Sequence, residues 1–214
     1  MSSKHASSNS FIEQARRRQI IDTTINLLAE HGYVNTSFAD IAEKLGSSKS
    51  LIAYHFVSKE KLLDEVVKQI SASRMEVIRT ALAATTDPLE RIAVMLKQDI
   101  AHMSSHIEQF RALAEISFHR YGSAGTLKFL SDNELLVYDT LKQLLAEAQS
   151  AGALRPDIDI ASLAVVLDGA RDAFLARYSQ AGGDIAVFTK TLLTCLAAAT
   201  TQDVTEITII EETI

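Results

Sequence analysis

The chain of 214 residues has little of several residue types that mark other protein classes. Its single cysteine, Cys195, excludes an intrachain disulfide and agrees with a reducing compartment. It contains only two prolines, which favours helices. No apolar run approaches the roughly 18 residues that suggest a transmembrane helix, and the polar N-terminus MSSKHASSNS lacks the apolar block of a signal peptide. We therefore expect a mostly helical, cytoplasmic protein with no membrane partner.

The sequence also lacks the short motifs of common enzymes. We find no Gly-rich phosphate loop, no His-Glu-x-x-His and no Gly-x-Ser-x-Gly. Cys195 lies among leucines and alanines, a setting typical of an inert thiol. Asp99, His102 and His106 share a helical face, but without a fourth ligand they favour a polar face over a metal site. We predict no enzymatic activity, no cofactor and no metal; a hydrolase or metal-binding helical protein is the weakest alternative.

Apolar and acidic residues are plentiful. Hydrophobic residues make up 47% of the chain, enough for a substantial core in one large or two small domains. The net charge of −6 is unevenly distributed. Residues 1–75 hold ten Lys and Arg against eight Asp and Glu (+2), and the rest holds eleven against nineteen (−8). The more basic surface lies in the N-terminal third, where contact with phosphates would need it.

Residues 35–59, NTSFADIAEKLGSSKSLIAYHFVSK, show the clearest local pattern. Thr36 and Ser37 can cap a helix whose buried stripe has helical spacing. Gly46 stands where a left-handed C-terminal cap is usual. The stripe consists of Phe38, Ile41, Ala42 and Leu45.

A second short helix follows that glycine almost at once. Ser47 or Ser48 caps it, and its buried contacts are Leu51 or Ile52 and then Phe56. Two helices joined by so tight a turn must cross steeply, which predicts a helix-turn-helix. An ordinary helical hairpin is the alternative. The residues expected to face outward are Lys49, Ser50, Ala53, Tyr54 and His55.

Helical periodicity and capping residues predict about nine helices in all. They are expected over about 11–31, the two helices just described, 59–84, 87–104, 106–121, 126–150, from Asp157 or Asp159 to 179, and 185–200. We divide the chain into a disordered arm (1–10), a helix-turn-helix domain (11–63, with a connecting helix at about 59–84), a larger helical domain (64–202) and a flexible tail (203–214).

Residues 16–63 resemble the DNA-binding domain of TetR-family transcriptional regulators. The matching features are Arg17, Ile20-Ile21, Gly32-Tyr33, Thr36-Ser37, Ile41-Ala42, Gly46, His55-Phe56, Ser58-Lys59-Glu60 and Leu62-Leu63. The sequence departs from the usual pattern at Ser47, where an apolar residue is common, and at Ala53, where an aromatic one is common. Beyond residue 75 the resemblance is one of layout.

A helix-turn-helix places its second helix in the major groove of DNA. On that geometry we expect Lys49, Ser50, Leu51 and Tyr54 to approach bases or the flanking backbone, and Ser37, His55 and Lys59 to contact phosphates. Arg16, Arg17 and Arg18 form either a solvated face or a phosphate contact. The predicted DNA-binding residues are Arg17, Ser37, Ser48, Lys49, Ser50, Leu51, Tyr54, His55 and Lys59.

For the larger domain, the resemblance implies a small-molecule pocket and a homodimer formed by the helices at about 160–179 and 185–200. The implied function is a repressor released from a palindromic operator in double-stranded DNA by an effector. A DNA-binding regulator controlled by a protein partner, without a pocket, is the alternative. Polar residues in otherwise apolar helices are the candidate effector contacts: His102, His106, Arg111, Glu115, His119, Arg120, Tyr138, Asp168 and Arg171.

Overall fold

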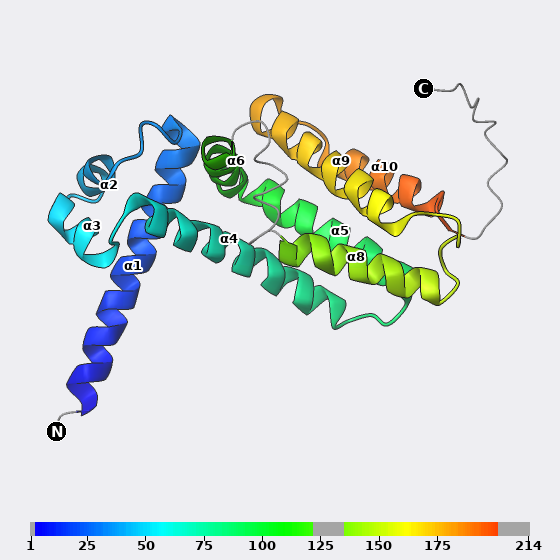
Figure 1. The fold of residues 1–214 in the computed structure, drawn as a ribbon, viewed down its shortest axis with the longest axis horizontal. Helices are drawn as coiled ribbons and strands as arrows, with labels where there is room; N and C mark the ends of the chain where they lie inside the picture. The colour runs from blue at the N-terminus through cyan, green and yellow to red at the C-terminus, as the bar shows by residue number, and fades with distance from the viewer. Residues whose placement is uncertain (1–2, 122–134, 201–214) are drawn as a thin grey trace.

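The computed structural model describes the backbone of residues 3–121 and 135–200, and the side chains of residues 11–119 and 136–200. Within these ranges the chain is all-α, as predicted, apart from one isolated β-bridge between Leu154 and Thr200. The helices are α1 (Ser3–His31), α2 (Phe38–Lys44), α3 (Lys49–His55), α4 (Lys59–Leu82), α5 (Pro88–Ser105), α6 (Ile107–Tyr121), α8 (Leu135–Ser150), α9 (Ile160–Ala181) and α10 (Ile185–Ala197) (Figure 1). None of these helices is both long and apolar enough to span a membrane.

Side-chain caps explain where most of these helices begin. A hydroxyl or carboxylate before the first turn accepts a backbone N–H that has no partner inside the helix. Ser37 and Asp40 form a reciprocal capping box at α2, where Thr36 and Ser37 were predicted. Where the sequence left two choices, the caps are Ser48 for α3 and Asp159 for α9. The remaining caps are Ser58, Asp87 and Asp184.

Helix α1 begins earlier than predicted. Its backbone is helical from Ser3, whereas residues 1–10 were expected to be a disordered arm. Residues 3–10 contain no glycine or proline, and extending an existing helix avoids the cost of nucleating a new one. The first turns of α1 therefore project beyond the helices that pack on it (Figure 1). The predicted start of the 126–150 helix and the 203–214 tail lie outside the described residues.

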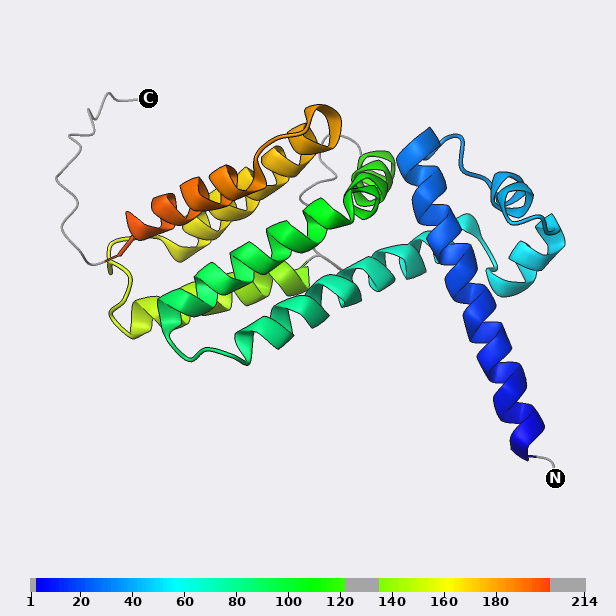
Figure 2. The same cartoon turned by 180° about the vertical axis from the view of Figure 1, so that it is seen from behind.

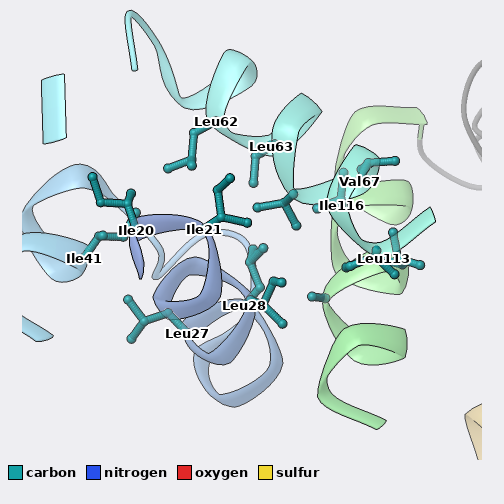
Figure 3. Close-up of a cluster of buried hydrophobic side chains, with 14 of the residues drawn as sticks. Ile20, Ile21, Leu27, Leu28, Ile41, Leu62, Leu63, Val67, Leu113 and Ile116 are labelled. Carbon is teal, nitrogen blue, oxygen red and sulfur yellow. The ribbon is translucent and has the colours of Figure 1, made fainter. Parts of the chain in front are cut away.

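We call residues 3–63 the head and residues 64–200 the body. The head is closed by a hydrophobic cluster that also takes in residues of three further helices of the body, α5, α6 and α9. Ile20 and Leu28 of α1, Ile52 of α3 and Leu62 of α4 have no exposed surface. Leu113 and Ile116 of α6 and Leu175 of α9 belong to the same cluster, several members of which are labelled in Figure 3. The head is therefore packed directly against α6.

A second hydrophobic cluster fills the body between α4, α5, α8, α9 and α10. Helix α4 contributes to both clusters, because Leu63 and Val67 lie in the first and Met75 and Ile78 in the second. It is thus the connecting helix that the sequence predicted over 59–84 (Figure 2). A rigid helix that is packed at both ends can carry a displacement from body to head.

Candidate nucleic-acid interface and regulatory contacts

Helices α2 and α3 form a tightly connected helix-turn-helix. Gly46 adopts the left-handed conformation predicted for it, with φ of 58°. The next residue, Ser47, donates its N–H to the Ala42 carbonyl over 2.9 Å, which closes the turn. Ala42 and Ile52 are 4% and 0% exposed, so the small residue and the apolar anchor pack where the spacing placed them. The alternative of an unrelated helical hairpin is not supported by this geometry.

The outer face of α3 is open to solvent. Ser48, Lys49, Ser50, Ala53 and Tyr54 are exposed, and Tyr54 retains 74% of its surface. Leu51 and His55 are partly buried at its edges, while Ile52 and Phe56 point inward. An ammonium group, hydroxyls and apolar groups are thus available together on one narrow helix face, which matches what base edges in a major groove require.

Two predicted contact serines also hold the fold together. Ser37 Oγ accepts the Ala39 and Asp40 N–H groups, and Ser48 Oγ accepts the Leu51 N–H over 3.2 Å. A hydroxyl has one proton to donate and two lone pairs. The cap uses lone pairs only, so Ser37 can still donate to a phosphate oxygen. Ser48 Oγ also lies 2.9 Å from Ser50 Oγ, and Ser48 can donate to phosphate when Ser50 is the donor of that pair.

The Arg17 side chain is engaged within the head and is not free in solvent. Its Nη1 donates to the His55 carbonyl over 2.5 Å, and its guanidinium lies 4.3 Å from the centre of the Phe56 ring. Arg17 therefore fastens the C-terminal end of α3 to α1. Its neighbour Arg18 is exposed, and Arg16 donates to Gln19 over 2.8 Å.

Lys59 plays the equivalent part at the start of α4. Its Nζ donates to the Tyr33 carbonyl over 2.6 Å and lies 3.8 Å from the centre of the Tyr33 ring. Burial lowers the pKa of Lys59 below its ordinary value, and the neighbouring Glu60 and Asp40 carboxylates oppose this. Arg17 and Lys59 thus position the helix-turn-helix from its two sides.

His55 lies at the edge of a hollow between α1 and α3. Burial is the main cause that lowers its pKa, and Arg17 and Arg16 act in the same direction, which favours the neutral imidazole. Its Nδ1 is buried without a hydrogen-bond partner among the described residues. The hollow, of about 320 Å³, is lined by Ile12, Glu13, Arg16, Leu51, Tyr54 and His55.

In the body, Asp168 and Arg171 belong to a buried ion cluster that also contains Arg74 and Asp99. Both oxygens of Asp99 accept from Arg74, over 2.9 Å each, and Arg171 Nη1 lies 2.9 Å from Asp99 Oδ2 and 2.7 Å from Asp168 Oδ1. All four residues are at most 6% exposed. The ion cluster ties α4, α5 and α9 together, so these two predicted effector contacts are occupied by each other and by neighbouring charges.

The pKa values of the two aspartates in the ion cluster are shifted in opposite directions. Burial by itself raises the pKa of Asp99, but Arg74 and then Arg171 outweigh it and lower that pKa to about 2. Burial also raises the pKa of Asp168, and here Arg171 does not outweigh it. The reason is that Arg171 is shared among Asp99, Asp168 and Asp172.

The other predicted effector residues fall into separate places. The His102 and His106 rings lie with their centres 4.4 Å apart and their planes tilted by 31°, and His102 Nε2 lies 3.3 Å from Ser73 Oγ. Burial, followed by His106, lowers the pKa of His102. Glu115 and His119 face the head instead, as described below. Arg111 bonds the Ser179 carbonyl, Lys142 lies 5.7 Å from the Tyr138 ring, and the Arg120 side chain lies outside the described residues.

Sequence reasoning missed three polar residues inside the body. Arg74 follows Val67 and Ile70 on the buried stripe of α4, and a charge in that register was the available signal. Ser71 Oγ and Gln109 Oε1 are buried with no hydrogen-bond partner among the described residues. Such orphan groups favour a ligand that supplies the missing bond.

Helix α10 borders a shallow groove of about 620 Å³ against α5. It is lined by Lys97, Ala186, Thr189, Lys190, Leu193, Thr194 and Ala197, none of which was among the predicted effector residues. Within the described ranges, no three histidine, cysteine, aspartate or glutamate side chains are grouped to hold a metal. Asp99 of the predicted polar face is instead held by two guanidinium groups.

An apolar surface on α9 and α10 faces away from the body core. Val165, Val166 and Val187 each expose 60% of their surface. Small exposed residues surround them: Ala161, Gly169, Ala173 and Ala176 on α9, Thr191 and Cys195 on α10, and Ala198 at the C-terminal cap of α10. Small residues let another helix approach closely, so this surface has the character of an unpartnered helix interface.

Comparison with known proteins agrees with this geometry. Residues 20–66 match the family described as "Bacterial regulatory proteins, tetR family". The HTH-type transcriptional repressor KstR2 of Mycobacterium tuberculosis is 23% identical over 146 residues, which span 68% of this chain and 72% of KstR2. The "Probable acrEF/envCD operon repressor" of Escherichia coli is 25% identical over 181 residues, 79% of each chain.

A solved structure shows the same fold beyond the head. FadR from Bacillus subtilis, in complex with stearoyl-CoA, has a TM-score of 0.74 at 17% identity, covering 85% of this chain and 98% of FadR. The family match covers the helix-turn-helix and its supporting helices, and the structural likeness extends to the body. Over residues 20–66 the chain thus matches the TetR family of bacterial regulators, and along most of its length it is similar to bacterial transcriptional repressors.

Proposed function

We propose that this protein is a sequence-specific repressor that a small molecule releases from a palindromic operator. The observation that carries the proposal is the exposed face of α3 in a helix-turn-helix whose apolar side is packed on the rest of the head. Lys49 on that face is exposed and has no ion pair among the described residues. An exposed cation on a helix that fits the major groove is suited to bind the phosphates or base edges of DNA. Such a protein would act in the cytoplasm, where bacterial DNA lies.

The predicted contacts divide into two roles on this proposal. Lys49, Ser50, Leu51 and Tyr54 read bases and the flanking backbone, with Ser37, Ser48 and His55 at the margins. Arg17 and Lys59 hold α3 in place, and any contact they make with phosphate is additional. A base-reading residue changes sequence preference when it is replaced, whereas a positioning residue weakens binding to all sequences alike.

Two copies are needed to read a palindrome. The apolar surface of α9 and α10 supports a homodimer through residues 160–179 and 185–200, because a second copy would cover its exposed valines. The head then corresponds to the DNA-binding domain and the body to the effector and dimerisation domain. Sedimentation of a monomer that retains full specific affinity at micromolar concentration would rule this arrangement out.

The effector site is proposed between α4, α5 and α6. Ser71, Gln109, His102 and His106 present polar groups there, two of which lack partners. FadR, a protein of this fold, was solved with stearoyl-CoA bound. The effector of this chain is proposed only as a small molecule that supplies hydrogen bonds within an apolar setting.

Selection of bound fragments from random DNA by the purified protein tests the proposed function. Recovery of one palindrome is expected, and steep loss of affinity with salt should accompany it. Lys49→Ala should change the recovered sequence, whereas Glu43→Ala on the exposed side of α2 should not. No enrichment of any sequence at low salt would refute the proposal.

Control by a protein partner is the second candidate. The ion cluster favours it to the extent that Asp168 and Arg171 are already occupied and so are not open to a small ligand. Compound screening for operator release separates the two, because only the first candidate predicts release by a small molecule alone.

A further inference from the structure

Tyr33 is the residue at which the head meets the body. It follows Gly32, which ends α1 in the left-handed conformation with φ of 77°. After such an end, the next N–H commonly bonds back to the helix it follows. Here the Tyr33 N–H donates instead to Glu115 Oε2 of α6, over 2.8 Å and 82 residues away in sequence. The last turn of α1 is thus completed by a carboxylate from the body.

The other groups of Tyr33 are engaged as well. Its carbonyl accepts from Lys59 Nζ over 2.6 Å, and its ring lies 3.8 Å from that ammonium. The His119 ring of α6 stacks on it with centres 4.6 Å apart and planes 16° from parallel. His119 Nε2 also lies 3.7 Å from Glu115 Oε2. The backbone and ring of one head residue are therefore held by two body side chains and by the first residue of α4.

Gly32 fits this contact for a steric reason. A Cβ added there would lie 3.0 Å from Glu115 Oε2, and its backbone conformation already disfavours other residues. The glycine thereby lets α6 approach the chain at the end of α1. Below the polar contacts, Leu113 and Ile116 of α6 join the hydrophobic cluster of the head (Figure 3).

Helix α6 joins this contact to the proposed effector site. It begins directly after His106, whose ring contacts that of His102 of α5 beside Ser73 of α4. Gln109, with its unpartnered oxygen, lies in its first turn. One end of a single helix thus borders the polar groups of the body, and the other end holds Tyr33.

We infer that Glu115 and His119, acting on Tyr33 and Lys59, form a latch that fixes the orientation of the head and responds to displacement of α6. This inference rests on the proposed function only for its link to operator release. A charge-assisted hydrogen bond depends steeply on distance and angle, whereas apolar contacts tolerate sliding. A small shift of α6 therefore breaks the latch while the hydrophobic cluster holds the head attached.

The test compares Glu115→Ala with Glu115→Gln and with Glu108→Ala, a charge-matched control on the same helix. Glu108 makes no ion pair or side-chain hydrogen bond among the described residues, whereas Glu115→Gln keeps an oxygen that can accept the Tyr33 N–H. Amide hydrogen exchange at Tyr33 reports the bond itself. Spin labels on Glu43→Cys and Ala101→Cys, in a chain with Cys195→Ser, report the distance between head and body.

Glu115→Ala should raise the amide exchange rate of Tyr33 by about tenfold and lower operator affinity by about tenfold, as expected for loss of a hydrogen bond to a charged group. It should also broaden the distribution of distances between the two spin labels. Glu115→Gln should give an exchange rate, an operator affinity and a distance distribution between those of Glu115→Ala and the original chain. Glu108→Ala should give the values of the original chain. If Glu115→Ala does not fold, His119→Ala and Glu115→Gln give the same readouts. Unchanged exchange and an unchanged distance distribution would overturn the latch. Failure to select any operator would refute the proposed function alone, since exchange and distance are measured without DNA.

Discussion

The cation on the outer face of α3 and the cations of the buried ion cluster in the body are used in opposite ways. Lys49 on α3 stands exposed with no ion pair among the described residues, whereas Arg74 and Arg171 are at most 3% exposed and share Asp99. A charge in water keeps its hydration until a partner replaces it, but a buried charge must be compensated from within. The outer face of α3 therefore presents its charge to another molecule, whereas the ion cluster uses its charges to fix the packing of α4, α5 and α9.

Asp99→Asn should produce the largest effect, because it leaves two buried guanidinium groups with one carboxylate fewer. We expect a loss of about 3–5 kcal/mol in the free energy of unfolding, measured by urea denaturation. Asp157→Asn, which breaks the exposed pair with Arg155, serves as the control and should leave the urea midpoint unchanged. Equal stability of Asp99→Asn and the original chain would show that the ion cluster does not fix the body.

Acid should remove the same stabilisation gradually. The pKa of Asp99 falls from 3.8 to about 2 on folding, so its ionised form stabilises the fold above pH 4 and this contribution disappears as pH falls through 2. The shift corresponds to about 2 kcal/mol. The raised pKa of Asp168 acts with opposite sign, since its contribution is greatest at low pH and is lost as pH rises. Urea titrations between pH 2 and 7 should show the gap between the original chain and Asp99→Asn narrowing with acid; a constant gap would contradict this assignment.

Replacing two cations of the head, Arg17 and Lys49, should affect different properties of the protein. Arg17→Ala removes the bond to the His55 carbonyl and the contact with the Phe56 ring, so we expect it to cost about 1–2 kcal/mol of stability. Lys49→Ala should change stability by less than about 0.5 kcal/mol and yet alter the selected DNA sequence. Thermal unfolding together with fragment selection measures both. The distinction fails if Lys49→Ala destabilises the head as much as Arg17→Ala does.

Arg18 should give the smallest effect. It is exposed, and the sequence left open whether the arginine triplet is a solvated face or a phosphate contact. If it meets DNA, Arg18→Ala should reduce the slope of log affinity against log salt by about 1 while keeping the selected sequence. An identical slope would assign Arg18 to the solvated face.

Local sequence patterns predicted most of the caps, the turn and the buried residues of the head. Ser37, Gly46, Ile52 and Phe56 are placed as their spacing required, because caps, turns and buried stripes depend on residues within a few positions of each other. The start of α1 was mistaken, because a polar stretch without helix breakers can extend a neighbouring helix.

The contacts of polar residues in the body were predicted less well. Asp168, Arg171, Glu115 and His119 were grouped as effector candidates, but the fold sends the first pair into the ion cluster and the second to Tyr33. Their partners lie on other helices, and helical periodicity states which face a residue occupies without stating what that face meets. Arg74 escaped notice for the same reason.

The sequence by itself determined the all-α class, the helix-turn-helix and the exposure of Lys49, Ser50, Ala53 and Tyr54 on α3, because each depends on short-range hydrogen bonding and on burial of one helix face. His55, which was also expected to face outward, is instead partly buried. Only the tertiary structure decided that Arg17 and Lys59 hold the helix-turn-helix in place and that Glu115 completes the end of α1. These bonds join groups 26 to 82 residues apart in the chain. Such pairs meet only because packing of the apolar faces brings their helices together.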